Sequence, residues 1–294
     1  MNVRPATDAD FPAMLELLAE DEEHVLGRPS RLSLGDLRAW LSAVDLETDT
    51  WLYEDAGLRA TGWCERAPGS DAVYAIGVVR PGSKGRGIGA GLVERSEARA
   101  VALGATRMHQ IALGADDAAA SLMVAKGYFE VRRFYEMAIE LRERPDVPDV
   151  RIETLSESDA REFHDALDEA FQDHWEHHSL SFDEWWARHS SADGFDLSLY
   201  FLIRDGGEIA AASRNEANRN GGGYVAALGV RRQWRGKGYA KALLLHTFRE
   251  LYDRGITRVT LGVDAQSPTG ATHLYERVGM HVEQENVVFE KQLT

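Results

Sequence analysis

Residues 228–243 read LGVRRQWRGKGYAKAL: the end of an apolar strand, a basic turn with two glycines, and the start of a helix. A helix N-terminus presents unpaired N–H groups and a partial positive charge. Gly236 and Gly238 carry no side chain, so a ligand can approach the backbone closely. Five cations stand within eleven residues: Arg231, Arg232, Arg235, Lys237 and Lys241. These features predict a pyrophosphate cradle, although a solvated basic turn joining strand to helix would share them.

Two better-known phosphate motifs are excluded. A P-loop requires G-x-x-x-x-G-K-[ST], which neither half of the chain contains. A dinucleotide fingerprint requires G-x-G-x-x-G, but residues 87–92 read GIGAGL and place Leu92 where the last glycine belongs. That segment also follows several strands instead of opening a βαβ unit.

The basic turn occurs twice. Residues 77–92, GVVRPGSKGRGIGAGL, align without a gap on residues 228–243 at an offset of 151. An earlier pair, VRPAT at 3–7 and VRIET at 150–154, has an offset of 147. A duplicated unit explains both. The prolines of residues 144–149, RPDVPD, mark a linker between domains 1–143 and 150–294.

Hydrophobic periodicity predicts the same order of elements in both halves. In the first half we expect strands at 2–4, 51–54, 58–65, 72–79, 108–112, near 131 and at 135–141, with helices at 8–23, 33–44, 87–103 and 117–126. In the second half we expect strands at 150–154, 199–204, 208–214, 224–230, 258–263 and 281–291, with helices at 158–171, 181–190, 237–253 and 269–278. Each half is therefore a mixed α/β layer.

Composition narrows the class of protein. The 294 residues are enough for two domains, and 33 Lys and Arg against 48 Asp and Glu give a formal charge of −15. This charge disfavours nucleic acid as a partner. One cysteine, Cys64, and the absence of a long apolar run or basic leader indicate a cytoplasmic protein with no membrane segment. Monomer and homodimer both stay open.

At these motifs the chain resembles the GCN5-related N-acetyltransferases (GNAT family), whose acetyl-CoA signature is [QR]-x-x-G-x-[GA]. Arg235-x-x-Gly238-x-Ala240 matches it, and Lys84-x-x-Gly87-x-Gly89 matches except that lysine replaces glutamine or arginine. The family's second landmark appears as ATHLYERVGM at residues 271–280. The resemblance covers nearly the whole chain and is closest to tandem members with a two-domain arrangement like that of mycothiol synthases.

The resemblance implies the fold and the cofactor site. It implies an α/β fold (α+β, mixed sheet) of two tandem GNAT domains, each a mostly antiparallel twisted sheet with a central splayed parallel strand pair and flanking helices. It implies acetyl-CoA as co-substrate, with no metal. The cofactor-binding residues that it implies are Leu228, Gly229, Val230, Arg235, Gly236, Lys237, Gly238, Tyr239 and Ala240 in the second half, and Val79, Lys84, Gly85, Arg86, Gly87 and Gly89 in the first.

The halves differ at the proton donor. Tyr275 falls where the family has a tyrosine beside the cofactor sulfur, and its phenol can protonate the departing thiolate. Aligning Gly127 with Gly279 places Met123 at the same position of the first half, and a thioether donates no proton. Tyr128 lies beyond the glycine and is out of register. We therefore expect a catalytic C-terminal domain and a degenerate or structural N-terminal domain. Whether the N-terminal domain still binds CoA stays open, although Arg86, Gly87 and Gly89 remain there.

The general base is less defined. Strand 224–230 carries no carboxylate, so Glu216 is the nearest candidate, with Asn215 beside it to orient a substrate. His174 is a second candidate because an unperturbed histidine titrates near pH ~6.5. His174 and His178 are also spaced as a metal pair on a helix, but no third ligand can be named. Trp175, Trp185 and Trp186 are expected to pack in the core more than to line an acceptor site.

Two classes of function follow. The first is an acetyltransferase that moves an acetyl group from acetyl-CoA to a primary amine of a small molecule by direct attack. No covalent enzyme intermediate is expected, because Cys64 lies in the half without the tyrosine. The alternative is a non-catalytic CoA-binding or regulatory tandem GNAT module.

Overall fold

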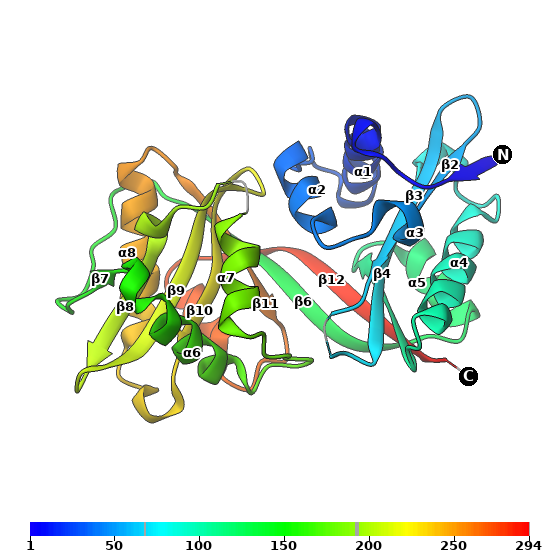
Figure 1. Cartoon of the computed structure of the whole chain (residues 1–294). Coiled ribbons are helices and arrows are strands. Elements are labelled where there is room, and N and C mark those ends of the chain that lie inside the picture. Colours follow the sequence, from blue (N-terminus) through cyan, green and yellow to red (C-terminus); the bar gives the residue numbers. More distant parts are fainter. Residues whose placement is uncertain (68, 192–193, 294) are drawn as a thin grey trace. The chain divides into compact units, whose positions relative to one another are not determined.

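A computed structural model describes residues 1–67, 69–191 and 194–293. The chain forms two compact units (Figure 1). Unit 1 comprises Met1–Phe134 and Gln284–Thr294, and unit 2 comprises Tyr135–Glu283. These units differ from the domain limits that the sequence suggests, 1–143 and 150–294, because two strands each contribute residues to both units.

Unit 1 is built on a six-stranded sheet in the order β1-β2-β3-β4-β5-β12. Its strands are β1 (Asn2–Arg4), β2 (Thr50–Glu54), β3 (Leu58–Glu65), β4 (Ala72–Val79), β5 (Arg107–Leu113) and β12 (His281–Gln292). The β4–β5 pair is parallel and the other pairs are antiparallel. The helices are α1 (Phe11–Leu26), α2 (Leu34–Leu41), α3 (Leu46–Asp49), α4 (Ile88–Ala102) and α5 (Asp117–Ala125).

Unit 2 repeats this plan in the order β7-β8-β9-β10-β11-β6. Its strands are β6 (Phe129–Glu140), β7 (Glu153–Thr154), β8 (Tyr200–Asp205), β9 (Glu208–Arg219), β10 (Gly222–Val230) and β11 (Arg258–Asp264). The β10–β11 pair is parallel, and the β7–β8, β8–β9 and β9–β10 pairs are antiparallel. The helices are α6 (Ala160–Phe171), α7 (Phe182–Ser190), α8 (Tyr239–Asp253) and α9 (Ala271–Arg277). The predicted mixed, mostly antiparallel fold with a parallel pair is confirmed.

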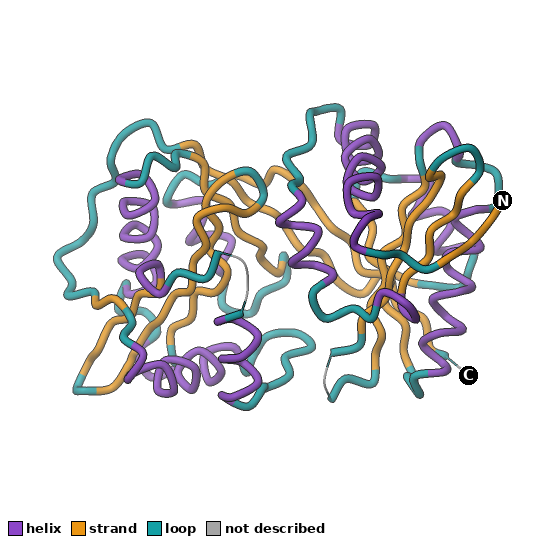
Figure 2. Tube along the Cα trace, turned by 45° about the horizontal axis from the view of Figure 1, so that its top comes forward, coloured by secondary structure: helices purple, strands orange, loops and turns teal. Residues whose placement is uncertain are grey.

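Helices cover both faces of each sheet, as Figure 2 shows for each unit. In unit 1, Leu92 and Val93 of α4 pack on one face of the sheet and Met14 and Leu18 of α1 on the other. In unit 2, α8 packs on one face through residues such as Leu244, while α6 and α7 pack on the other. Among the described residues, no helix has the length and apolar character needed to cross a bilayer.

Local sequence explains where several helices begin. The Ser33 and Asp36 pair and the Ser181 and Glu184 pair form capping boxes, in which side chain and backbone satisfy each other's hydrogen-bonding groups. Gly27 ends α1 in the left-handed conformation, with φ of 67°. These local signals are why most element predictions hold to within a few residues.

Five differences from the predicted elements are clear. The strands expected near 131 and at 135–141 form a single strand, β6, and the strand expected at 208–214 extends to Arg219. The strand expected at 150–154 shrinks to Glu153–Thr154, and the short helix α3 was not expected. The largest difference is an exchange of strands. Residues 286–292 of β12 pair with β5 of unit 1, while β6, which follows α5 directly, lies beside β11.

Candidate active site

The basic turn of unit 2 has the backbone geometry that its sequence predicts. Gly236 and Gly238 have φ of 83° and 86°, in the left-handed region, and Gly238 caps the N-terminus of α8. A Cβ added at either glycine would meet no atom within 4 Å, so the space over the turn is open. Ala242 makes the first bond of the helix, donating to the Gly238 carbonyl at 3.1 Å. The N–H groups that precede it fit an anion such as a diphosphate.

The cations of this turn are largely neutralised. Arg232 and Arg235 both bind Asp173, and hydrogen bonding, mainly from Arg232, lowers the pKa of that carboxyl to about 2. Nζ of Lys237 lies 2.6 Å from Oδ2 of Asp205, which also accepts a hydrogen bond from Tyr239. Arg231 binds Glu169 and Glu208. The positive field of the turn therefore comes mainly from backbone N–H groups, and only Lys241 among these five cations has no carboxylate partner in the described part of the chain.

Strand β10 separates from its parallel partner almost at once. β10 and β11 pair only at Gly223 with Val259 and at Tyr224 with Thr260. In unit 1 the corresponding pairing extends over the whole of Ala72–Ile76. The register between β9 and β10 shifts between Val225 and Ala227, so Ala226 is an extra residue that forms a β-bulge.

The bulge leaves an open strand edge at the predicted cofactor residues. Within the described residues, the β11-facing backbone groups of residues 227–230 have no ladder partner on β11. That edge contains Leu228, Gly229 and Val230. Gly229 cannot carry a side chain without a shift of α6, because a Cβ there would lie 2.8 Å from Cβ of Ala170 on that helix.

Tyr275 lies on α9 in the core of unit 2. Its side chain is buried, and burial, with a smaller contribution from Tyr224, raises the pKa of its phenol to about 12. The phenol is therefore protonated at neutral pH and can serve as a donor. Two residues beyond the end of the helix, Gly279 has a φ of 94°, which lets the Met280 N–H donate to the Tyr275 carbonyl at 3.0 Å.

Tyr224 is a candidate site residue that the sequence reasoning missed. It occupies the last pair before β10 and β11 separate, and burial raises the pKa of its phenol. The guanidinium carbon of Arg219 lies 4.1 Å from the centre of its ring. A Cβ at Gly262 would come within 3.3 Å of its hydroxyl, so the glycine makes room for it. One signal was available: Tyr74 holds the equivalent place in unit 1, at an offset of 150 and not 151.

Glu216 lies directly opposite Tyr224 on β9. Its Oε1 accepts a hydrogen bond from Arg214 at 3.0 Å and lies 3.5 Å from Nη1 of Arg219. Glu216 is therefore near the strand opening but is held by two cations. Asn215 is on the opposite face, buried, and donates to the Leu199 carbonyl at 2.7 Å, so the structure gives it a packing role in place of substrate orientation.

His174 lies in a turn after α6 and not on a helix, so its spacing from His178 no longer indicates a metal pair. Its ring stacks on Phe171 with centroids 4.3 Å apart, and burial lowers its pKa. Nε2 of His178 is 3.8 Å from Oε2 of Glu176. No group of three His, Cys, Asp or Glu side chains able to hold a metal occurs in the described ranges. Trp185 and Trp186 pack in the core cluster under α6, as expected.

The turn of unit 1 has the same backbone form. Gly85 and Gly87 have φ of 76° and 80° with open space over both. Nζ of Lys84 is held between Oδ1 of Asp21 at 2.8 Å and Oδ2 of Asp116 at 3.0 Å. Arg86 is exposed. Gly89 lets α5 approach, since a Cβ there would lie 3.0 Å from Leu122.

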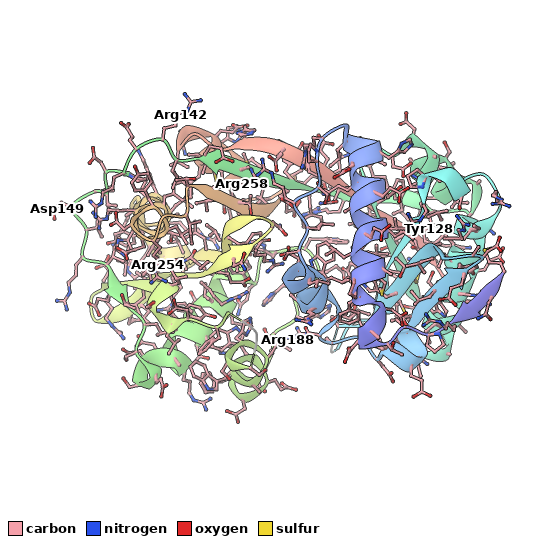
Figure 3. The ribbon with its side chains drawn as sticks, turned by 90° about the horizontal axis from the view of Figure 1, so that it is seen from above. Tyr128, Arg142, Asp149, Arg188, Arg254 and Arg258 are labelled. Carbon is pink, nitrogen blue, oxygen red and sulfur yellow. The ribbon has the colours of Figure 1, made fainter. Side chains whose placement is uncertain are left out.

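A cavity of about 350 Å³ adjoins this turn, and its walls include Val79 and Met123. Tyr128, labelled in Figure 3, is not among the residues that line this cavity. It is buried in the core, and the Lys291 ammonium lies 5.4 Å from the centre of its ring. Cys64 is also buried, and burial raises the pKa of its thiol to about 12, so it is not a nucleophile at neutral pH.

Comparison with known proteins agrees with these features. Residues 160–280 match the model of the Acetyltransferase (GNAT) family. A mycothiol acetyltransferase of Nocardiopsis dassonvillei is 30% identical over 265 residues, covering 79% of this chain and 78% of the relative. A mycothiol acetyltransferase of Catenulispora acidiphila is 25% identical and covers 98% of this chain and 97% of its own length.

Solved structures give the same result. The crystal structure of a GCN5-related N-acetyltransferase from Sphaerobacter thermophilus superposes with a TM-score of 0.87 at 29% identity, covering 99% of this chain and 95% of that one. A tandem GNAT protein from the clavulanic acid biosynthesis pathway has a TM-score of 0.76 at 14% identity over 100% of this chain and 98% of that one, which indicates a shared fold. With its open glycine turns, its parted parallel strands and these relatives, the chain belongs to the GNAT family of acetyltransferases.

Proposed function

We propose that this protein transfers an acetyl group from acetyl-CoA to a primary amine of a small molecule, and that unit 2 performs the transfer. The observation that carries the proposal is the bulge at Ala226, which parts β10 from β11 in the unit that holds Tyr275. Unit 1 has neither this bulge nor a tyrosine at Met123. The proposal includes a cytoplasmic location, which the single buried Cys64 supports.

Binding is assigned to backbone groups. The N–H groups around Gly238 would hold the diphosphate. The edge of residues 227–230, which does not pair with β11, would bind the pantetheine amides as an added strand does. Acetyl-CoA supplies an activated thioester. Fixing it beside the amine turns an encounter between two molecules into a reaction within one complex.

Tyr275 would act on the sulfur. A thiol has an ordinary pKa near ~8.5, so a thiolate that leaves into a water-poor site needs a donor. The Tyr275 phenol keeps its proton at neutral pH and would donate it as the carbon–sulfur bond breaks. The burial that raises the pKa of the phenol also raises the pKa of the departing thiol, so the two pKa values shift in the same direction.

Two residues are candidates for accepting the proton of the amine. Glu216 lies across from Tyr224, beside the strand opening, and would act as the base once the amine competes with Arg214 for it. His174 is neutral at pH 7 because burial lowers its pKa, so it also has a free nitrogen. The relatives are named mycothiol acetyltransferase, so mycothiol-related amines are the first acceptors to try.

The test is CoA release from acetyl-CoA with a panel of primary amines. We expect turnover on at least one amine, and its loss in Tyr275→Phe. Met123 in unit 1 favours a second candidate, a CoA-binding module without catalysis. Saturable binding of acetyl-CoA with no turnover on any amine would support that candidate and refute the transfer.

A further inference from the structure

The cavity of unit 1 reaches well beyond the anion-binding turn. It extends from residues 84–90 to Ser96 on α4 and Gln110 on β5. Gly87 immediately precedes α4, and Ser96 follows nine residues later, so the cavity runs for about 14 Å along the helix. Trp51 and Gly62 close it on the side of the sheet.

The two ends of this cavity differ in chemistry. The near end has the left-handed glycines and the N-terminus of α4, which suit an anion. The far end is lined by apolar atoms, including those of Ala75, Leu92 and Val93. Its polar side chains satisfy each other, because Nε2 of Gln110 donates to Oγ of Ser96 at 2.7 Å and both are buried. The far end therefore suits a hydrocarbon.

The internal repeat shows that the far end is specific to unit 1. Gly62 pairs with Gly77 across β3 and β4, and the equivalent pair across β9 and β10 is Ser213 with Leu228. The register also places Val225 at the position of Ala75. At each of these wall positions unit 2 has the larger side chain, and Val225 and Leu228 lie in its core cluster.

We propose that unit 1 binds, without transferring it, an acyl-CoA whose acyl group is a hydrocarbon chain longer than acetyl. The inference rests on the proposed function, because it takes the turn 84–89 as a diphosphate site. The diphosphate lies against the N-terminus of α4, and the chain extends beneath α4 toward Ser96. Met123 lines the cavity where unit 2 has Tyr275, so this site has no phenol at the sulfur.

The first test is a calorimetric titration of the whole protein, without amine, with acetyl-, butyryl-, hexanoyl- and octanoyl-CoA. Each buried methylene tightens binding by about fourfold, so the four additional methylenes of hexanoyl-CoA lower the Kd by about 250-fold relative to acetyl-CoA if all of them are buried. Equal dissociation constants throughout the series would overturn the proposal.

The second test fills the cavity with the residue that unit 2 uses. A Cβ at Gly77 would lie 3.3 Å from Leu92, a side chain that can yield, and the backbone there is not left-handed. Gly77→Leu should abolish the dependence on chain length and leave acetyl-CoA binding within about threefold, an energy change near RT. A retained dependence would overturn the assignment. A parallel loss of affinity for acetyl-CoA would also overturn the assignment, because the cavity would then hold only the pantetheine arm.

Two further variants complete the design. Ala102→Leu adds the same bulk on the exposed side of α4 and should change nothing. If thermal melting shows that Gly77→Leu does not fold, Ala75→Val, which copies Val225, is judged by the same two criteria. The inference and the proposed function fail separately. An intact chain-length series without turnover refutes only the transfer, and a flat series with normal turnover refutes only the acyl site.

Discussion

Oε2 of Glu290 lies 2.8 Å from Nε2 of His109 and 3.2 Å from Nη1 of Arg107, within unit 1. His109 is fully buried, and the Glu290 side chain is 12% exposed. Glu290 belongs to the last strand of the chain, β12, and the other two residues to β5. Unit 1 is therefore completed by residues 286–292 of β12, and residues 1–143 lack one strand of its sheet.

Removing this carboxylate should destabilise unit 1. Glu290→Ala removes the carboxylate that Arg107 and His109 share, while Arg107 keeps its ion pair with Asp71. Breaking a largely buried pair costs about 3 kcal/mol. Urea unfolding measures the change, with exposed Glu276→Ala as the control. A change in Glu290→Ala no larger than in the control would show that β12 is not held in this way.

The effect should depend on pH. Burial tends to raise the pKa of Glu290, but the hydrogen bonds from His109 and Arg107 outweigh burial and lower it. A lowered pKa stabilises the fold above the unfolded value, near ~4.3, and this stabilisation is lost as the pH falls through the folded value. The difference between wild type and Glu290→Ala should therefore shrink below about pH 4.

His189 should make unit 2 less stable in mild acid. Burial, with a smaller contribution from Arg214, lowers its pKa to about 4, whereas the unfolded value is near ~6.5. Between these values the unfolded chain binds the extra proton, so stability falls by about 1.4 kcal/mol for each unit that the pH drops. From pH 8 to pH 5, wild type should lose about 2 kcal/mol more than His189→Gln in urea unfolding. Equal losses would mean that His189 is protonated in the folded protein.

The bulge at Ala226 is expected to be required for activity. Deleting Ala226 would give β10 the spacing of β4, which pairs with its neighbour as far as Ile76. The unit should still fold, because unit 1 does so without the bulge. Misplacing the thioester by one residue should lower turnover by about 100-fold or more. Full turnover in a folded deletion variant would show that activity does not require the opening between β10 and β11.

Gly238 is predicted to bind through its backbone. Gly238→Ala puts a Cβ in the open space before α8 and forces alanine into the left-handed region, at a cost of roughly 1 kcal/mol. Gly255→Ala is a matched control, since Gly255 has φ of 78° and open space at the other end of α8. Both variants should lose similar stability, but only Gly238→Ala should weaken acetyl-CoA binding in a titration. Equal affinity in the two would exclude the turn as the diphosphate site.

The sequence predicted the features that depend on neighbouring residues. The glycine turns and most helix limits follow from local pattern, and the duplication made each half a check on the other. The parallel pair was implied only by the family resemblance. Arg232 and Arg235 show the limit of prediction from local sequence. Their positive charges suggested that they bind a diphosphate. Their partner Asp173, however, is about sixty residues away in sequence, and only folding brings it close.

The pairing between strands also could not be predicted from the sequence. The pattern of β6 and β12 shows that both are strands, but alternation does not say which neighbour each will take. The bulge, in contrast, could have been predicted by comparing the two halves of the sequence. Tyr74 stands three residues before Gly77, whereas Tyr224 stands four before Leu228, and this one extra residue is Ala226.

The most direct measurement is turnover of acetyl-CoA by Tyr275→Phe and, in parallel, by Met123→Phe, each with its affinity for acetyl-CoA. Loss of the phenol should lower kcat by about 100-fold or more and leave affinity nearly unchanged, while Met123→Phe keeps full kcat. An unchanged kcat in Tyr275→Phe, or a collapse in Met123→Phe alone, would place the chemistry outside unit 2.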